Sequence, residues 1–432
     1  MIDKILSYEF SVFRFQFSGK RFVKHPFFAG SVIMIFGTNI ANFFAYLYHL
    51  ILGRMLGPAA YGELAAILAT LGEFSTAFAF LGLVIVKFAS SVEESNKPKL
   101  FSWFMAKSIY IGLTLLISLL IFTPKVADFL RLPHKTVFLI GPILFLYLFS
   151  FLYRSFLQGL LEFSKVVVLT NLDILSRLIF GVIFVWFGLS SFGAVGAILV
   201  GAILSYFLGS YFLKKYRVKS KISHFDGGSE IIKYALPVFV ASIANNSLIS
   251  SDVILAKHFF DAHNAGIYAS LSTLGKIVFY GTGPVSAVMF PLVSKKFSKG
   301  QNYTKIFILS LGLTSAIAAS VVIVYTLLPK LMVSILFGDE FLEAAPKLMY
   351  FGVFIAIYTI ANVFVSLELS VNRTKVVILP FVFAIAQVVG IFLYHDSIFD
   401  LVKVSIVVCT LLLGSLLIYF GYGRKKYEER RE

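Results

Sequence analysis

The sequence has a single cysteine, Cys409, among its 432 residues, so it can form no internal disulfide and no thiol-based metal site. Charged residues are scarce, at 14%, and no long polar block occurs, which argues against an attached soluble catalytic domain. The N-terminus is basic and aromatic, and it lacks the short apolar core followed by small residues of a cleavable signal peptide. We therefore expect neither an enzyme active site nor a bound metal or cofactor.

Apolar residues dominate the chain instead. They make up 59% of the sequence, and the mean hydropathy is +0.89. A soluble core of this length does not need so many apolar residues, whereas a stack of membrane spans of about 20 residues each does. The composition predicts an all-α, multi-pass integral protein of the cell membrane. We expect twelve helical spans, at about 27–52, 62–89, 100–122, 137–161, 166–189, 192–213, 229–256, 266–294, 305–329, 345–370, 376–394 and 401–421.

Basic residues give these spans a direction. The connections on the same side as the two chain ends carry 24 lysines and arginines, and the connections on the other side carry 7. Because basic connections stay in the cytoplasm, we expect both termini to be cytoplasmic. The formal net charge of +16 then reflects membrane orientation, and nucleic acid is not expected as a partner.

The two halves of the chain share a recognisable segment, because residues 40–54 align with residues 243–257 at a constant shift. The matched pairs are Asn42 with Asn245, Arg54 with Lys257 and, after one inserted residue, Gly62 with Gly266. Six spans return each half to the side on which it began. The chain is therefore expected to consist of two parallel six-helix repeats, an architecture typical of transporters.

Charge runs and the repeat set the expected boundaries. The first segment keeps apolar residues at helical spacing among lysines and arginines, which predicts an amphipathic helix on the membrane surface. The expected parts are this interfacial segment at 1–26, an N-lobe at 27–213, a cytoplasmic linker at 214–228, a C-lobe at 229–421 and a cytoplasmic tail at 422–432.

Polar residues recur on one face of the first span of each half. Polar groups face lipid only at a high energetic cost, so both faces should meet a partner helix or a wet cavity. The first face carries Asn39, Asn42, Tyr46 and His49, and the aligned second face carries Ser242, Asn245, Ile249 and Asp252.

The charged residues inside spans fall into two groups by depth. Lys87, Lys107, Arg154 and Lys233 lie near the cytoplasmic ends, where they either reach the membrane surface or together form a basic vestibule.

The second group lies near mid-depth, where a charge costs several kcal/mol unless it is paired or wet. Asp173 and Arg177 are four residues apart and can pair within one helix. Glu73 and Lys276 lie at matching depths in the two halves. We expect them to form an ion pair across the lobes in one access state and to separate in the other.

Four short segments resemble a known family. Residues 52–62, which read LGRMLGPAAYG, resemble the signature after the first span of polysaccharide (O-unit, Wzx-type) flippases. Residues 252–257, 265–268 and 289–294 resemble the matching segments of the second half. The chain is thereby identified as a member of the multidrug/oligosaccharidyl-lipid/polysaccharide flippase superfamily.

The resemblance implies two lobes around a central cavity that moves a polyprenyl-diphosphate-linked oligosaccharide to the outer leaflet by alternating access. The partners implied are this anionic lipid-linked oligosaccharide, the bilayer and the downstream polysaccharide assembly machinery. No ATP-binding loop is present, so H+ or Na+ coupling or substrate supply would provide the energy. The expected substrate-binding residues are Arg154, Arg177, Lys276, Lys107, Lys233, Arg54, Lys257, Asn42 and Asn245, and the expected coupling or gating residues are Glu73, Asp173 and Asp252.

Three alternatives stay open at this point. A drug or cation antiporter of the same superfamily would favour an acidic cavity, whereas basic residues here match or outnumber acidic ones. A peptidoglycan-precursor flippase would be expected to carry extra spans. A membrane-embedded glycosyl polymerase would be expected to carry a large external loop with catalytic side chains, and the longest external connection here has about 18 residues.

Overall fold

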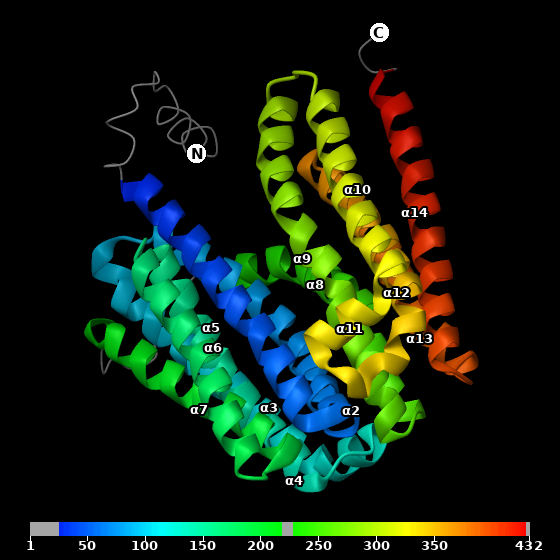
Figure 1. Ribbon diagram of the computed structural model, residues 1–432. Helices are drawn as coiled ribbons and strands as arrows, with labels where there is room; N and C mark the ends of the chain where they lie inside the picture. The colour runs from blue at the N-terminus through cyan, green and yellow to red at the C-terminus, as the bar shows by residue number, and fades with distance from the viewer. Residues whose placement is uncertain (1–25, 218–227, 429–432) are drawn as a thin grey trace.

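The computed structural model describes residues 26–217 and 228–428, and these form helices with no strand among them (Figure 1). The N-lobe contains α2 (Pro26–Ser91), α3 (Lys97–Leu130), α4 (His134–Phe138), α5 (Ile140–Gly159), α6 (Phe163–Trp186) and α7 (Ser190–Phe212). The C-lobe contains α8 (Gly228–Phe259), α9 (Ala262–Ser298), α10 (Thr304–Leu327), α11 (Pro329–Phe337), α12 (Ala345–Ser370), α13 (Ile378–Leu393) and α14 (Ile398–Glu428). Short 3-10 turns η2 (Glu94–Asn96), η3 (Lys214–Tyr216), η4 (Asp339–Ala344) and η5 (Thr374–Val377) join some of them.

Each predicted span overlaps one of these helices, but the ends of five differ from the helix ends: 137–161, 166–189, 192–213, 305–329 and 376–394. Ten helices of the described chain are long and apolar enough to cross a membrane, which does not confirm the count of twelve. The predicted interfacial helix at 1–26 and most of the linker at 214–228 lie outside the described residues. The part of the linker that is described, η3, is fixed to the N-lobe, since the Tyr216 hydroxyl donates to Glu94 at 3.2 Å.

The helix α2 contains two predicted spans, 27–52 and 62–89, and it bends between them. The bend is at Gly57, whose φ of 67° and ψ of 174° are not helical, and Pro58 follows it. Glycine reaches a positive φ without strain because it has no Cβ. The family-like residues 52–62 therefore form a corner that returns the chain into the membrane.

The long helix α2 also lies between the lobes (Figure 1). It packs against α5 and α6 of its own lobe and against α8 and α9 of the other. In the N-lobe α6 packs along α7, and in the C-lobe α12 packs between α9 and α14. This arrangement places the middle of α2 at the boundary where any central path between the lobes must run.

The lobes touch at one end of the bundle and diverge at the other, where α2 begins and α14 ends (Figure 1). The touching end carries the connections that hold few basic residues, which are the predicted external ones. Two glycines meet there: a Cβ added at Gly62 would lie 2.7 Å from the backbone nitrogen of Gly266. With the predicted orientation, the structure is closed toward the outside and open toward the cytoplasm.

Candidate functional site

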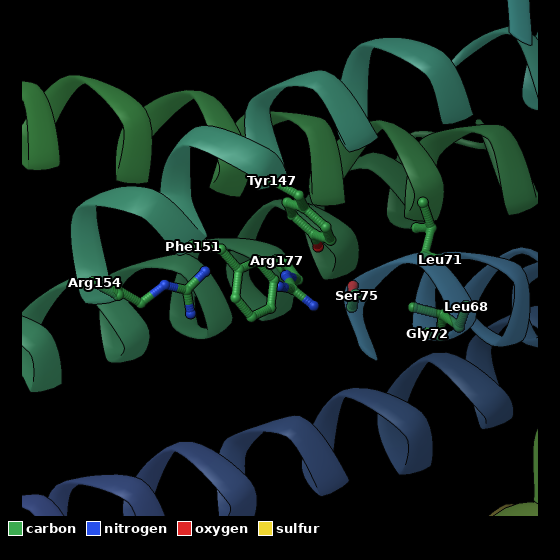
Figure 2. Close-up of a pocket in the computed structure, with 8 residues that line it drawn as sticks. All are labelled: Leu68, Leu71, Gly72, Ser75, Tyr147, Phe151, Arg154 and Arg177. Atoms are coloured by element: carbon green, nitrogen blue, oxygen red, sulfur yellow. The ribbon is translucent and has the colours of Figure 1, made fainter. Parts of the chain in front are cut away.

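A pocket of about 180 Å³ lies in the N-lobe, between α2, α5 and α6 (Figure 2). Its charged residues are Arg154 from α5 and Arg177 from α6, both of which were expected to bind substrate. We call this the guanidinium pocket. Its remaining lining residues are Leu68, Leu71, Gly72, Ser75, Tyr147 and Phe151.

One buried carboxylate holds both guanidinium groups in place. Arg177 donates to Asp173 through Nε at 3.1 Å and through Nη2 at 2.5 Å, which confirms the pair expected from their spacing. Arg154 Nη2 lies 3.8 Å from the same carboxylate, and its Nε donates to the Ser150 carbonyl at 3.2 Å. The Asp173 side chain is only 2% exposed, whereas those of Arg154 and Arg177 are 18% and 21% exposed.

Aromatic rings support the two guanidinium groups. Arg154 lies over Phe151 with 5.2 Å between guanidinium carbon and ring centre, and Arg177 lies over Tyr147 at 5.3 Å. Such stacking favours a cation and restricts its orientation. Two arginines with one aspartate leave one net positive charge. The pocket is therefore suited to a planar or tetrahedral oxyanion, such as a phosphate.

A second charged group spans the boundary between the lobes. Glu73 of α2 interacts electrostatically with Lys276 of α9 and lies beside the amide of Asn246 of α8. Lys276 also interacts with Asp252. No ion pair within 4.0 Å joins Glu73 and Lys276 in the described part of the chain, so the predicted pair is not formed in this structure.

The C-lobe holds a buried polar chain around Asp252. The Tyr268 hydroxyl donates to Asp252 at 2.7 Å, and both residues are fully buried. Ser405 interacts with Tyr268 and receives a hydrogen bond from the Gln387 amide at 2.9 Å. The chain links α8, α9, α13 and α14, so a change at Asp252 can reach four helices of this lobe.

A hydrogen bond joins the lobes at their closed end. The Tyr61 hydroxyl of α2 lies 2.8 Å from the Thr273 hydroxyl of α9 and 3.0 Å from His49 Nδ1. Tyr61 is fully buried, and the next residue, Gly62, packs against Gly266. We call these contacts, together with those of Arg54 described next, the outer contact layer.

The helix α11 and turn η4 of the C-lobe cover the corner of α2. Arg54 donates to the carbonyls of Ser334, at 3.2 Å, and of Ile335. The rings of Phe337 and Phe341 lie 5.2 and 5.9 Å from that of Tyr61. Arg54 therefore lies at the closed end, where its guanidinium satisfies helix carbonyls of the opposite lobe.

Lys257, the partner of Arg54 in the repeat, is only 2% exposed. It lies in the electrostatic field of Glu63, Arg131 and Asp261, of which Glu63 belongs to α2 in the other lobe. Beside it, the His258 ring stacks on Phe129 of α3 at 4.1 Å, another contact between the lobes. The sequence did not predict this burial, because it depends on contact between the lobes.

The loop after α8 is tied to the start of α9. Asp261 caps α9 by accepting a hydrogen bond from the Asn264 backbone N–H at 3.0 Å. The backbone N–H and the side-chain amide of Asn264 both donate to Asp261, and they hold the pKa of its carboxyl below its usual value. The cap fixes where α9 begins and so helps to set the position of Gly266.

The remaining predicted residues do not converge on the guanidinium pocket. Lys107 is exposed on α3, with its ammonium 6.0 Å from the Trp103 ring centre, and does not line the pocket. Asn42 is exposed on α2, and the Asn245 backbone carbonyl accepts from Tyr358 at 2.9 Å. Lys233 lies in α8, but its side chain is outside the described residues.

Six pocket residues were not expected from the sequence, and three of them carry a hydroxyl group or an aromatic ring: Ser75, Tyr147 and Phe151. Tyr147 and Phe151 precede Arg154 by seven and three residues on α5, which places them on the same helical face. That spacing was the available signal. Ser75 belongs to another helix, so no local pattern could have indicated it.

Comparison with known proteins agrees with this architecture. A family model described as polysaccharide biosynthesis protein matches residues 27–297, which is more than half of the chain. No curated protein sequence matches closely enough to name as a relative.

Solved structures share the fold at low sequence identity. An inward-facing multidrug resistance MATE family transporter of the MOP superfamily has a TM-score of 0.75 at 12% identity, covering 88% of this chain and 96% of the other. The lipid II flippase MurJ, in an inward closed conformation, has a TM-score of 0.72 at 14% identity, covering 89% and 87%. A MOP superfamily transporter from Pyrococcus furiosus has a TM-score of 0.61 at 16% identity, covering 97% and 100%.

Proposed function

Because the chain belongs to the polysaccharide biosynthesis protein family, we propose that it flips a polyprenyl-diphosphate-linked oligosaccharide from the cytoplasmic to the outer leaflet. The family and the fold are those of transporters and flippases, so the chain is a multi-pass transporter of the plasma membrane and not an enzyme. The observation that supports this substrate is the guanidinium pocket, where two arginines share one carboxylate.

The pocket suits the head of such a lipid. Arg154 and Arg177 bind the diphosphate, whose negative charge must leave water to cross the membrane. The polyprenyl tail can stay in the bilayer while the head moves between the lobes. Lys107, Lys233, Asn42 and Asn245 are proposed as weaker contacts along the path from the cytoplasm.

Transport then requires the outer contact layer to separate. When it opens, Arg54 loses the carbonyls of α11 and Lys257 becomes accessible at the outer mouth. Both cations then line the exit, where the headgroup leaves them and becomes solvated by external water. Lys276, which makes no ion pair among the described residues, is positioned on α9 to receive the diphosphate during this passage.

Coupling is assigned to the carboxylates at the lobe boundary and in the pocket. Glu73 and Asp252 interact with Lys276, so protonation or cation binding at either one changes the charge balance between the lobes. Asp173 gates the pocket by competing with the substrate for the two arginines. H+ or Na+ is the proposed coupling ion, and downstream polysaccharide assembly machinery would receive the product.

A drug or cation antiporter is the second candidate, since Glu73 and Asp252 place two carboxylates near the central boundary. The two functions predict opposite cargo charge. Purified protein in liposomes, given a polyprenyl-diphosphate-linked oligosaccharide on one side, should expose it to a lectin on the other side. Export of ethidium without oligosaccharide flipping would instead establish the antiporter.

The arginines provide the specific test. Replacing both Arg154 and Arg177 by Gln should reduce flipping at least tenfold while the protein still inserts and remains folded. Lys403→Gln is the matched control, since it removes an exposed cation that pairs with Asp400 away from the pocket. Flipping by the double variant at the control's rate would contradict the proposed role of the pocket.

A further inference from the structure

The hydroxyl of Tyr147 is a buried polar group that the fold itself does not use. Tyr147 is 5% exposed, and its hydroxyl oxygen is shielded from solvent without a hydrogen-bond partner among the described residues. A buried hydroxyl without a hydrogen-bond partner destabilises a folded protein. Such a cost in a folded protein calls for an explanation, and a ligand is one.

The hydroxyl points into the guanidinium pocket. Figure 2 shows it at the end of the ring, directed toward the Arg177 guanidinium and the side of the pocket where Ser75 lies. The ring itself lies against Arg177, with 5.3 Å between the guanidinium carbon and the ring centre. Its orientation is therefore set by the same contacts that set Arg177.

The neighbouring arginines keep donors available beside this hydroxyl. Arg177 uses Nε and Nη2 for Asp173, and Arg154 uses Nε for the Ser150 carbonyl. In the part of the chain that the structure describes, Nη1 of each arginine donates to no protein atom. A guanidinium carries five N–H donors, so both groups can bind an oxygen without releasing their present partners.

The repeat supplies an internal comparison for Tyr147. The helix α5 ends at Gly159 and α12 ends at Ser370, and each is followed by a residue with a φ of 61°, Leu161 and Asn372. The same hydrogen bond closes both turns, from Glu162 N to Leu157 O at 2.9 Å and from Arg373 N to Glu368 O at 2.9 Å. The matched helix ends, positive-φ residues and hydrogen-bonded residues are each 211 residues apart in the sequence. We therefore treat α5 and α12 as equivalent helices of the repeat, related by a shift of 211 residues.

The shift of 211 residues places Tyr147 on Tyr358, so both lobes carry a tyrosine at this position. The Tyr358 hydroxyl has a protein partner, since it donates to the Asn245 carbonyl at 2.9 Å. The same shift replaces Arg154 by Val365, Asp173 by Ala384 and Arg177 by Val388. One copy of the tyrosine therefore serves the fold, and the other lies with its hydroxyl unpaired among charged groups.

We propose that the Tyr147 hydroxyl is a substrate ligand that donates a hydrogen bond to the diphosphate held by Arg154 and Arg177. The inference rests on the proposed function and adds a neutral donor to its two cations. The anion then receives three donors, two from Nη1 atoms and one from the phenol. The C-lobe lacks this set at the equivalent position, so the site formed by two arginines and a tyrosine belongs to the N-lobe.

The test uses Tyr147→Phe, which removes only the hydroxyl, and farnesyl diphosphate as the probe. Calorimetric titration of the purified protein should give an affinity about tenfold weaker for the variant, because a hydrogen bond to a charged group is lost. The melting temperature should stay unchanged, since no bond within the protein is lost. Tyr358→Phe, the matched control, should behave in the opposite way, with a lower melting temperature and unchanged affinity.

The outcomes separate the two claims. Wild-type protein that binds farnesyl diphosphate no better than uncharged farnesol contradicts the proposed function and this inference together. Wild-type protein that binds it well, with equal affinity for Tyr147→Phe, contradicts the inference alone. A melting temperature that falls for Tyr147→Phe while affinity is retained assigns the hydroxyl to the fold.

Discussion

Tyr61 and Thr273 share a hydrogen bond of 2.8 Å that joins the two lobes at their closed end. Tyr61 comes from the corner of α2 and Thr273 from α9, so the bond can exist only while the outer mouth is shut. It makes the balance between the two access states depend on a pair of hydroxyl groups. A ligand or substitution acts on that balance only through such differences between states.

We predict that Thr273→Val opens the outer mouth more often, because it keeps the side-chain shape and removes the hydroxyl. Loss of the hydrogen bond should destabilise the closed state by about 1 kcal/mol, which shifts the equilibrium toward the open state roughly fivefold. Labelling of a cysteine at Ala69 from outside should become faster by that factor, in a Cys409→Ser background. Ala69 is buried on the face of α2 that carries Gly62 and Glu73. Thr273→Ser keeps the bond and should label like the wild type.

Gly266→Ala should have a far larger effect. An added Cβ would lie 1.7 Å from the Pro58 carbonyl oxygen, which is backbone and cannot turn aside. We expect the outer mouth to stay open, the Ala69 cysteine to label rapidly and flipping to be nearly abolished. Gly283→Ala in the same helix is the control, since its Cβ would meet nothing within 4 Å. Normal flipping by Gly266→Ala would show that this glycine contact is not needed for closure.

Asp173→Asn should leave two partly buried guanidinium groups without their counter-charge. Breaking a buried ion pair costs about 3–5 kcal/mol, so the melting temperature should fall. Added pyrophosphate should restore much of that loss, because it can replace the carboxylate. The control is Glu368→Gln, which breaks an ion pair with Arg373 in the C-lobe and should gain no such protection. Equal responses of the two variants would mean that the pocket does not select anions.

Glu73 and Lys276 should act as a pair across the lobes. In this structure they interact without direct contact, and we expect the ion pair to form in the other access state. Each single reversal, Glu73→Lys or Lys276→Glu, places like charges together and should reduce flipping. The double reversal should recover part of the activity. A double variant no better than the worse single one would show that each residue has its partner within its own lobe.

The orientation predicted from basic residues can be checked directly. Single cysteines at Ser223 and Asn264, in the Cys409→Ser background, should react from opposite sides of the membrane. Asn264 follows the Asp261 cap at the closed end of the bundle, whereas Ser223 belongs to the linker predicted to be cytoplasmic. Reaction of both from one side would overturn the twelve-span topology.

The sequence predicted those parts of the site that depend on local spacing. Asp173 and Arg177 lie on successive turns of one helix, so their pairing followed from position alone. Arg154 joins them because α5 packs against α6, which no local pattern specifies. For the same reason the burial of Lys257 was missed, since it depends on contact between the lobes.

Two other features were missed for different physical reasons. The helix α11 lies within a connection that hydropathy assigned to the outside, because a nine-residue helix is too short to register as a span. The meeting of Gly62 with Gly266 was not anticipated, although the alignment had matched them. Sequence equivalence places two residues at the same point of each repeat, but it does not say that those points touch.

The contact between Gly62 and Gly266 has a consequence for membrane leakage. Because no side chain separates the two backbones, rotamer changes cannot open a passage there for water or ions. The outer mouth can open only by movement of whole lobes, so the permeability barrier and the transport step are controlled by the same event. Liposomes that contain Gly266→Ala should therefore leak protons as well as lose flipping, and tight liposomes would show that another layer provides the barrier.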